Sequence, residues 1–254
     1  MKKMIAILAV AMLLWGASAS ADTLDFLKPF WMQMMDGVSN TASGKVPENV
    51  TVTCADERLT VEACGVLLEN DYSAEAHVYA VLKNTGSERL PIRSVQMTVL
   101  GANGNTLHQE NYVSYMPSVV EPGETMLVSE WMYDFVKEIG KVDSIQISVE
   151  TASRVNEKWK QLGDVRAWLD GDYLCVEFTN TTEKTLFGVI CAATVSDANG
   201  QILDMMMQSP YDTDDLGIAQ GSSIVWRKRL EDAATLKIGT DAVCKAWAYW
   251  MEDL

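Results

Sequence analysis

Residues 84–107 read NTGSERLPIRSVQMTVLGANGNTL, and residues 180–203 read NTTEKTLFGVICAATVSDANGQIL. The two stretches share nine identical residues over 24 ungapped positions, at a constant separation of 96 residues. The match resumes two residues out of step, with residues 122–125 (PGET) opposite residues 220–223 (QGSS). A period of 96 is too long for one unit of a solenoid and suits a whole small domain. The sequence therefore predicts one domain used twice.

The repeated residues are of the kinds that shape turns and fill cores. Asn103-Gly104 is a turn signal, because this pair readily adopts the positive φ of tight hairpin turns. Apolar residues alternate before it, as in Val95-Met97-Val99 and the matching Cys191-Ala193-Val195. Short strands with frequent turn signals and no long amphipathic helices are typical of β-sandwiches. We therefore expect an all-β protein with two tandem immunoglobulin-like β-sandwich domains, at residues 50–151 and 164–254.

The pattern also predicts how each domain begins. Residues 50–54 and 59–63 alternate with period two around a turn, which indicates a hairpin leading into the first domain. The strand that carries Val78-Ala80-Leu82 is expected to bury one face. Residues 152–163 are mostly polar and predict a connector, and its short length favours a fixed or hinged pair of domains.

The first 49 residues are predicted to lie outside both domains. Residues 1–21 combine two Lys residues, an apolar run and Ala19-Ser20-Ala21, which is the pattern of a cleaved secretory signal peptide. Residues 22–49 then hold an apolar segment, 24–35, and a polar linker. That segment is predicted either to dock on a partner or another copy, or to pack on the first domain as a strap.

The charge of the chain narrows the choice of partner. Its net charge is −15, and it becomes −17 without residues 1–21, which carry two Lys residues and no acid. This balance argues against nucleic acid and against anionic membrane surfaces, which both favour clusters of Lys and Arg. We expect an exported protein, either extracellular or in the periplasm or cell envelope, without stable membrane insertion.

The chain has an odd number of cysteines, so at least one thiol is free. None lies at a repeated position, which argues against a shared bridge of the immunoglobulin type. We expect buried free thiols that act as small hydrophobic residues. The alternative is a Cys175–Cys191 bridge, since these two residues flank one connection and can be joined if both side chains point the same way. The sequence leaves the pairing open for Cys54, Cys64, Cys175, Cys191 and Cys244.

The repeated string resembles a known family. It runs from Asn-Thr through an apolar strand and Ala-Asn-Gly to Pro-Gly-Glu, and it is similar to the bacterial extracellular immunoglobulin-like modules called FxLYD domains. It is similar also to secreted modules of the immunoprotective extracellular protein type. The resemblance covers residues 75–150 and 165–250 and implies a tandem sandwich with no catalytic pattern. The aromatic pair that precedes the Asn-Gly turn in that family is replaced by Val99-Leu100 and Val195-Ser196.

Few residues suggest chemistry. His77 and His108 have no partner at metal-ligand spacing, and no strained nucleophile turn such as Gly-x-Ser-x-Gly occurs. We therefore expect no catalytic residues, no cofactor-binding residues and no cofactor, with one exception for Ca²⁺. Carboxylates at alternate positions before a glycine can wrap that ion, and the candidate ligands are Asp212, Asp214 and Asp215. A solvated acidic loop is the alternative for this stretch.

Two groups of apolar residues have a functional and a structural interpretation. Met205-Met206-Met207 can bind copper or a peptide, because thioethers are soft and adaptable ligands, or it can fill a core. Trp131, Trp226, Trp247 and Trp250 can stack on sugars if they are exposed, or they can belong to the core.

The leading hypothesis is a non-enzymatic exported binding protein that contacts an envelope or extracellular protein of unknown identity, or another copy of itself. The alternative is an extracellular hydrolase or a Ca²⁺-dependent carbohydrate binder that uses the acidic loop of the second domain. A third hypothesis is a structural spacer.

Overall fold

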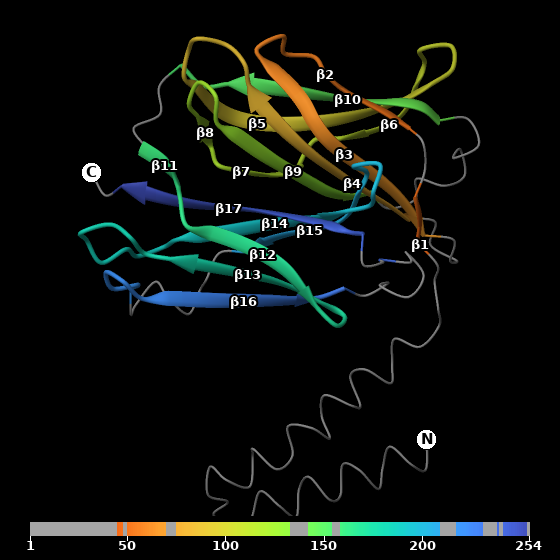
Figure 1. Cartoon of the computed structure of the whole chain (residues 1–254). Helices are drawn as coiled ribbons and strands as arrows, with labels where there is room; N and C mark the ends of the chain where they lie inside the picture. Colours follow the sequence, from red (N-terminus) through yellow and green to blue (C-terminus); the bar gives the residue numbers. More distant parts are fainter. Residues whose placement is uncertain are drawn as a thin grey trace, which may run out of the picture. The chain divides into compact units, whose positions relative to one another are not determined.

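The computed structural model describes residues 45–47, 50–69, 75–132, 142–153, 158–208, 217–230, 238 and 241–252. Residues 44–254 form one compact unit. The described residues form strands and no helix (Figure 1), so the predicted all-β sandwich fold is confirmed. The expected signal peptide at 1–21 and the apolar segment at 24–35 lie outside the described residues.

The first sandwich has two sheets. Sheet 1 has the strand order β1-β3-β4-β9-β7, and sheet 2 has the order β2-β10-β5-β6, with β8 paired to β5. The strands of sheet 1 are β1 (Lys45–Pro47), β3 (Leu59–Glu69), β4 (Glu75–Asn84), β7 (Ser114–Met116) and β9 (Thr125–Met132). The strands of sheet 2 are β2 (Thr51–Cys54), β5 (Leu90–Gly101), β6 (Thr106–Glu110), β8 (Val119–Val120) and β10 (Val142–Thr151).

The second sandwich also has two sheets. Sheet 3 has the order β11-β17-β14-β15, and sheet 4 has the order β12-β13-β16. Their strands are β11 (Lys158–Leu162), β12 (Val165–Asp170), β13 (Tyr173–Thr179), β14 (Ile190–Ser196), β15 (Ile202–Gln208), β16 (Ser223–Arg229) and β17 (Val243–Glu252).

The strand pairings repeat between the two sandwiches, as the internal repeat predicts. The neighbours β3-β4-β9 of sheet 1 correspond to β12-β13-β16 of sheet 4, and β10-β5-β6 of sheet 2 correspond to β17-β14-β15 of sheet 3. The two Asn-Gly turns also correspond, because Gly104 and Gly200 have φ values of 72° and 84°. Each turn glycine donates its amide to the carbonyl three residues before it.

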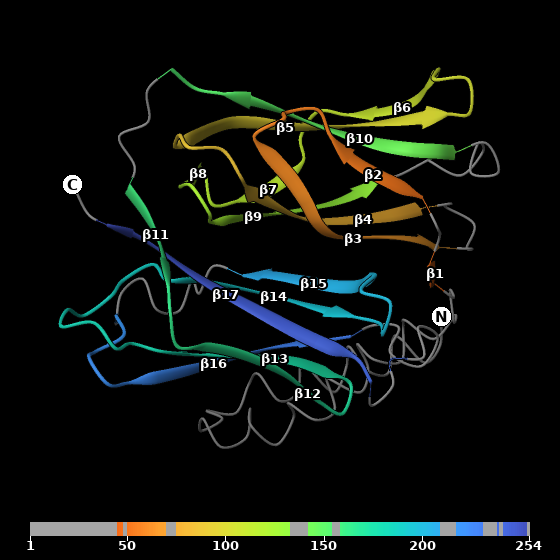
Figure 2. The ribbon, with the colours of Figure 1, turned by 45° about the horizontal axis from the view of Figure 1, so that its top comes forward.

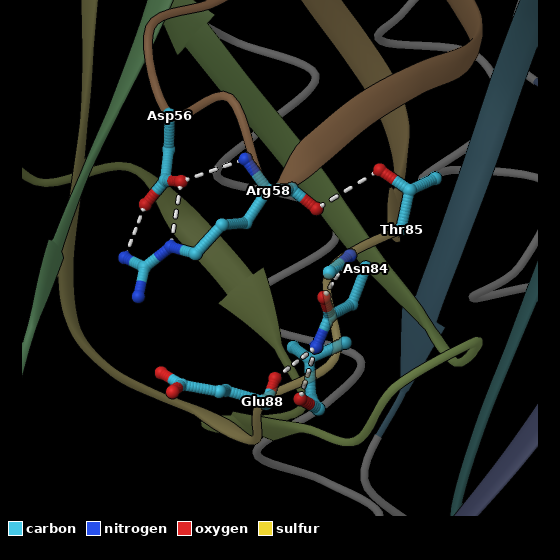
Figure 3. Close-up of polar contacts among 7 residues, drawn as sticks. Asp56, Arg58, Asn84, Thr85 and Glu88 are labelled. Atoms are coloured by element: carbon cyan, nitrogen blue, oxygen red, sulfur yellow. Dashed lines mark hydrogen bonds and ion pairs between the residues drawn. The ribbon is translucent and has the colours of Figure 1, made fainter.

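The repeated Asn-Thr pair has a structural explanation (Figure 3). Asn84 is fully buried at the end of β4, and its amide nitrogen donates to the carbonyls of Glu88 and Val120 at 2.8 and 3.0 Å. Its side-chain oxygen accepts the amide of Gly86 at 3.0 Å. The side chain therefore fixes the loop that carries the chain from β4 to β5, and it ties that loop to β8.

The structure corrects two expectations about connections. The predicted hairpin of residues 50–63 does not form: β2 joins sheet 2, where it pairs in parallel with β10, while β3 joins sheet 1. The same apolar alternation is compatible with a chain that passes from one sheet to the other. Val52 of β2 and Leu59 of β3 then face the same core from opposite sheets. The predicted connector of residues 152–163 contains β11, which pairs with β17.

Strand β4 of sheet 1 is buried on both faces over residues 78–82, contrary to the expectation of one buried face. Val78, Ala80 and Leu82 face the core of the first sandwich. The intervening Tyr79 and Val81 belong to a second cluster, which also includes the core of the second sandwich. Figure 2 shows sheet 1 facing sheet 3. The two sandwiches therefore bury apolar surface against each other, which favours a fixed pair over a hinged one.

Candidate functional site

Three acidic residues are predicted to bind calcium. Asp212, Asp214 and Asp215 lie outside the described residues. The two histidines are on different sheets, His77 in β4 and His108 in β6. Within the part of the chain that the structure describes, no three His, Cys, Asp or Glu side chains are grouped to hold a metal ion.

The apolar candidates divide between core and surface. Met205 and Met206 are buried in the second cluster, which supports their interpretation as core residues. Trp226, Trp247 and Trp250 are buried, whereas Trp131 is 40% exposed and its ring lies 4.6 Å from that of His77.

All five cysteines are free, so the alternative of a Cys175–Cys191 bridge is wrong. Cys191 points into the second sandwich and is fully buried. Burial raises the pKa of the Cys191 thiol far above its ordinary value, and it also raises the pKa of Cys54, Cys64 and Cys244. A raised pKa keeps these thiols protonated at neutral pH, and protonated thiols are poor nucleophiles.

At the inter-sandwich interface, where sheet 1 faces sheet 3, backbone and side-chain atoms of the two sheets are in close contact. A Cβ atom on Gly65 of β3 would lie 1.8 Å from the backbone oxygen of Ile202, so only glycine fits there. The Tyr249 hydroxyl of β17 donates to the Thr125 carbonyl of β9 at 3.1 Å, within a buried site. Desolvation there raises the pKa of Tyr249.

A buried carboxylate at this interface connects sheets 1, 3 and 4. Asp204 of β15 accepts a bond from the Lys228 ammonium of β16 at 2.6 Å, which joins sheets 3 and 4. The Tyr79 hydroxyl of sheet 1 also donates to Asp204, at 3.4 Å. Asp204 is 8% exposed, and a buried carboxylate needs such partners to offset its desolvation. Asp204 therefore forms a structural ion pair, and its carboxylate already accepts hydrogen bonds from protein groups.

A cleft opens at the edge of the interface, and we call it the interface cleft. One hollow of the cleft has a volume of about 200 Å³ and is lined by Glu62, Ala63 and Val81 of sheet 1. The opposite wall is formed mainly by sheet 3, with Thr194, Ser196, Lys245 and Trp247. A second hollow of about 420 Å³ adjoins it, because both are lined by Glu62, Ala63 and Gly200.

The outer face of sheet 4 points away from the core of the second sandwich. Alternate residues of its strands bring charged and aromatic side chains together on this face. Arg166 pairs with Glu177, and Arg227 pairs with Asp170. The two guanidinium groups lie over aromatic rings, each at 5.3 Å from the ring centroid. Trp168, Tyr173 and Val225 complete the face, which is defined by Arg166, Trp168, Asp170, Tyr173, Cys175, Glu177, Val225 and Arg227.

Comparisons with known proteins add little to this geometry. No family model matches the sequence, and no curated protein matches it. Among solved structures, one of red sea bream transglutaminase matches with 13% sequence identity and a TM-score of 0.20. That match covers 68% of this chain, and it spans only 27% of the transglutaminase chain. The described residues also include no helix long and apolar enough to cross a membrane.

Reasoning from the sequence missed the interface and its cleft. Tyr79, Asp204 and Lys228 are too far apart in sequence to form a motif. One signal was available, because residues 76–82 (AHVYAVL) are almost continuously apolar. Strands buried on both faces have such runs, whereas strands with one solvated face alternate.

Proposed function

We propose that this protein is an exported binding protein without enzymatic activity. It consists of two immunoglobulin-like modules of the FxLYD type, and it acts at the bacterial envelope or outside the cell. Its partner is another protein, which it contacts through the outer face of sheet 4.

The observation that carries this proposal is the composition of that face. Trp, Tyr and Arg are the residues that dominate the binding energy of protein interfaces. Trp168, Tyr173, Arg166 and Arg227 gather there, and Tyr173 and Val225 expose 36% and 48% of their surface. The ion pairs hold the Arg side chains over the rings, so little conformational entropy remains to be lost on binding.

The internal repeat gives independent support. The outer face of sheet 4 corresponds to the face of sheet 1 that packs on sheet 3. By the repeat, Val225 corresponds to Leu127, which is fully buried in that interface. The equivalent face of the first module, on sheet 1, therefore already binds a sheet of another module within this same chain.

Affinity capture from envelope extracts tests the proposal. We expect one protein to be retained by the wild-type chain and lost with a double variant, Tyr173→Ala with Val225→Asp. Tyr112→Ala is the matched control, since Tyr112 is 90% exposed in the first sandwich. Retention by the double variant would overturn this surface, and a turnover assay that succeeds without a partner would overturn the non-enzymatic function.

Sedimentation of the purified chain separates the two kinds of partner. A dimer that the same double variant dissociates would identify a second copy as the occupant of the face. A monomer at all concentrations, together with specific capture, would identify a different protein.

A further inference from the structure

We propose that the edge of β16 that faces away from β13, which we call the β16 edge, binds an extended segment of the partner protein as an added antiparallel strand. This inference rests on the proposed function, because it states how a partner at the outer face of sheet 4 is held. The group recognised is the main chain of a polypeptide with a polar residue followed by two apolar residues.

The two modules differ at a pair of corresponding strands. Strand β9 of sheet 1 has two neighbours, β4 and β7, whereas its counterpart β16 has one neighbour among the described residues, which is β13. Strand β7 pairs with residues 127–129 of β9, and by the repeat these correspond to residues 225–227 of β16. An edge strand presents main-chain N–H and C=O groups that can pair with another chain.

The main-chain groups of Val225 and Arg227 point to the β16 edge. Residues of an antiparallel strand alternate between bonding to one neighbour and bonding to the other. The Leu230 amide donates to the Asp172 carbonyl at 2.7 Å, and the register of β13 with β16 continues from there without a shift. The even-numbered residues of β16 therefore bond to β13, and Val225 and Arg227 direct their N–H and C=O groups away from it.

The first module has the same alternation, with its edge occupied. The Asn84 amide donates to the Glu124 carbonyl at 2.9 Å, so the even-numbered residues of β9 bond to β4. The odd-numbered Leu127 is then directed to β7, where it lies opposite Met116. The β16 edge therefore presents the same main-chain groups, in the same phase, that receive a strand in the first module.

The side chains along β16 determine which segment fits. Val225 is 48% exposed on the outer face of sheet 4, Trp226 faces the core on the other side, and Arg227 pairs with Asp170. A strand added in the register of β7 would place one apolar residue beside Val225, another beside Trp226 and a polar residue beside Arg227. The segment Ser114-Tyr115-Met116 of β7 has this composition.

Titration of the full chain with a synthetic peptide that copies residues 111–118 (NYVSYMPS) tests the β16 edge. We expect saturable ¹H–¹⁵N shifts, and slower hydrogen exchange of the Val225 and Arg227 amides in the complex. The Trp226 and Lys228 amides bond to β13, so their exchange should be slow with and without the peptide. Slow exchange of the Val225 and Arg227 amides in the isolated chain, at any concentration, would show that the edge is already paired and would overturn the proposal.

Two methylated peptides supply the matched comparison. In the register of β7, the peptide nitrogen of Met116 donates to β16, whereas that of Tyr115 points away from it. Methylation of the Met116 nitrogen should weaken binding about fivefold or more, from the ordinary value of one hydrogen bond. Methylation of the Tyr115 nitrogen should leave the affinity unchanged. Equal weakening by the two methyl groups, or no saturable binding of the unmodified peptide, would overturn the proposal.

Val225→Pro separates this inference from the proposed function. It removes an N–H at the β16 edge and no bond to β13, and edge strands tolerate proline at such positions. Slow exchange of the Trp226 and Lys228 amides in this variant checks that sheet 4 is intact. We expect Val225→Pro to lose the protein that the wild-type chain captures from envelope extracts.

The failures of the two proposals are distinguishable. Capture that persists with Val225→Pro, but is lost with Tyr173→Ala and Val225→Asp together, would overturn strand addition and leave the proposed function standing. A wild-type chain that captures no protein would overturn both.

Discussion

Asn84 and Asn180 occupy the same position in the two sandwiches and form the same bonds. The Asn84 amide donates to the carbonyls of Glu88 and Val120, and the Asn180 amide donates to those of Lys184 and Ile218 at 2.8 and 2.6 Å. Val120 and Ile218 are 98 residues apart, whereas the asparagines are 96 apart. The two extra residues of the second copy therefore lie between Asn180 and Ile218, the acceptor that is further along the chain.

We expect Asn84→Ala and Asn180→Ala each to lower the free energy of unfolding by about 2–3 kcal/mol, because each leaves buried carbonyls without a donor. Denaturant unfolding measures the loss. Asn103→Ala is the control, since Asn103 is exposed in a turn, and its effect should be within about 0.5 kcal/mol. Equal effects of the buried and exposed substitutions would contradict this role for the asparagines.

Gly65→Ala should destabilise the protein by about 3 kcal/mol. The added methyl group would overlap the backbone oxygen of Ile202, which has no rotamer to escape into, so the sandwiches must separate. Thermal and denaturant unfolding measure the effect. Gly163→Ala is the matched control, because nothing lies within 4 Å of its Cβ position. A stable Gly65→Ala variant would show that the sandwiches are not in close contact there.

The Asp204–Lys228 ion pair should show measurable coupling. Lys228→Met removes the cation from a buried carboxylate, and we expect it to cost about 2 kcal/mol. A double-mutant cycle with Asp204→Asn should give a coupling energy of about 1 kcal/mol. The exposed Arg93–Glu150 pair, at 3.0 Å, is the comparison and should couple by less than about 0.5 kcal/mol. Similar coupling of the two pairs would refute a structural role for Asp204.

Asp56 should make stability depend on pH. Its carboxylate accepts bonds from the Arg58 side chain at 2.9 and 2.6 Å (Figure 3), and these bonds lower the pKa of Asp56 below its ordinary value of 3.8. A lowered pKa stabilises the folded protein above that value, and the contribution is lost as the pH falls through the lowered pKa.

We therefore expect Asp56→Asn to cost about 1 kcal/mol at pH 7, and the difference from wild type to shrink below about pH 4. Unfolding curves recorded between pH 2 and pH 7 test this. Asp143→Asn, at an exposed position of β10, serves as the control. A difference that stays constant down to pH 2 would show that the ionised pair is not its cause.

The sequence predicted the strands and turns well, because these depend on residues close together in the chain. Gly104 and Gly200 indicate their turns because glycine after asparagine readily adopts a positive φ. The alternation of Val95, Met97 and Val99 with other residues indicates their strand. The sequence did not predict where each strand pairs: an alternating strand such as β2 fits a hairpin or a sheet change equally. It also did not reveal the interface cleft, because Thr194 and Lys245 become neighbours only after β14 and β17 pair.

The contact between sheets 1 and 3 joins two surfaces that do not correspond, since sheet 1 is the counterpart of sheet 4. Repetition of such a head-to-tail contact builds a ring where the rotation closes and an open filament where it does not. The second module carries charges at the equivalent positions of sheet 4: Glu177 corresponds to Val81 of the first module, and Arg227 corresponds to Ser129. Any protein that docks on sheet 4 must therefore accommodate those two ion pairs, which selects for a polar partner surface and against the apolar packing that joins sheets 1 and 3.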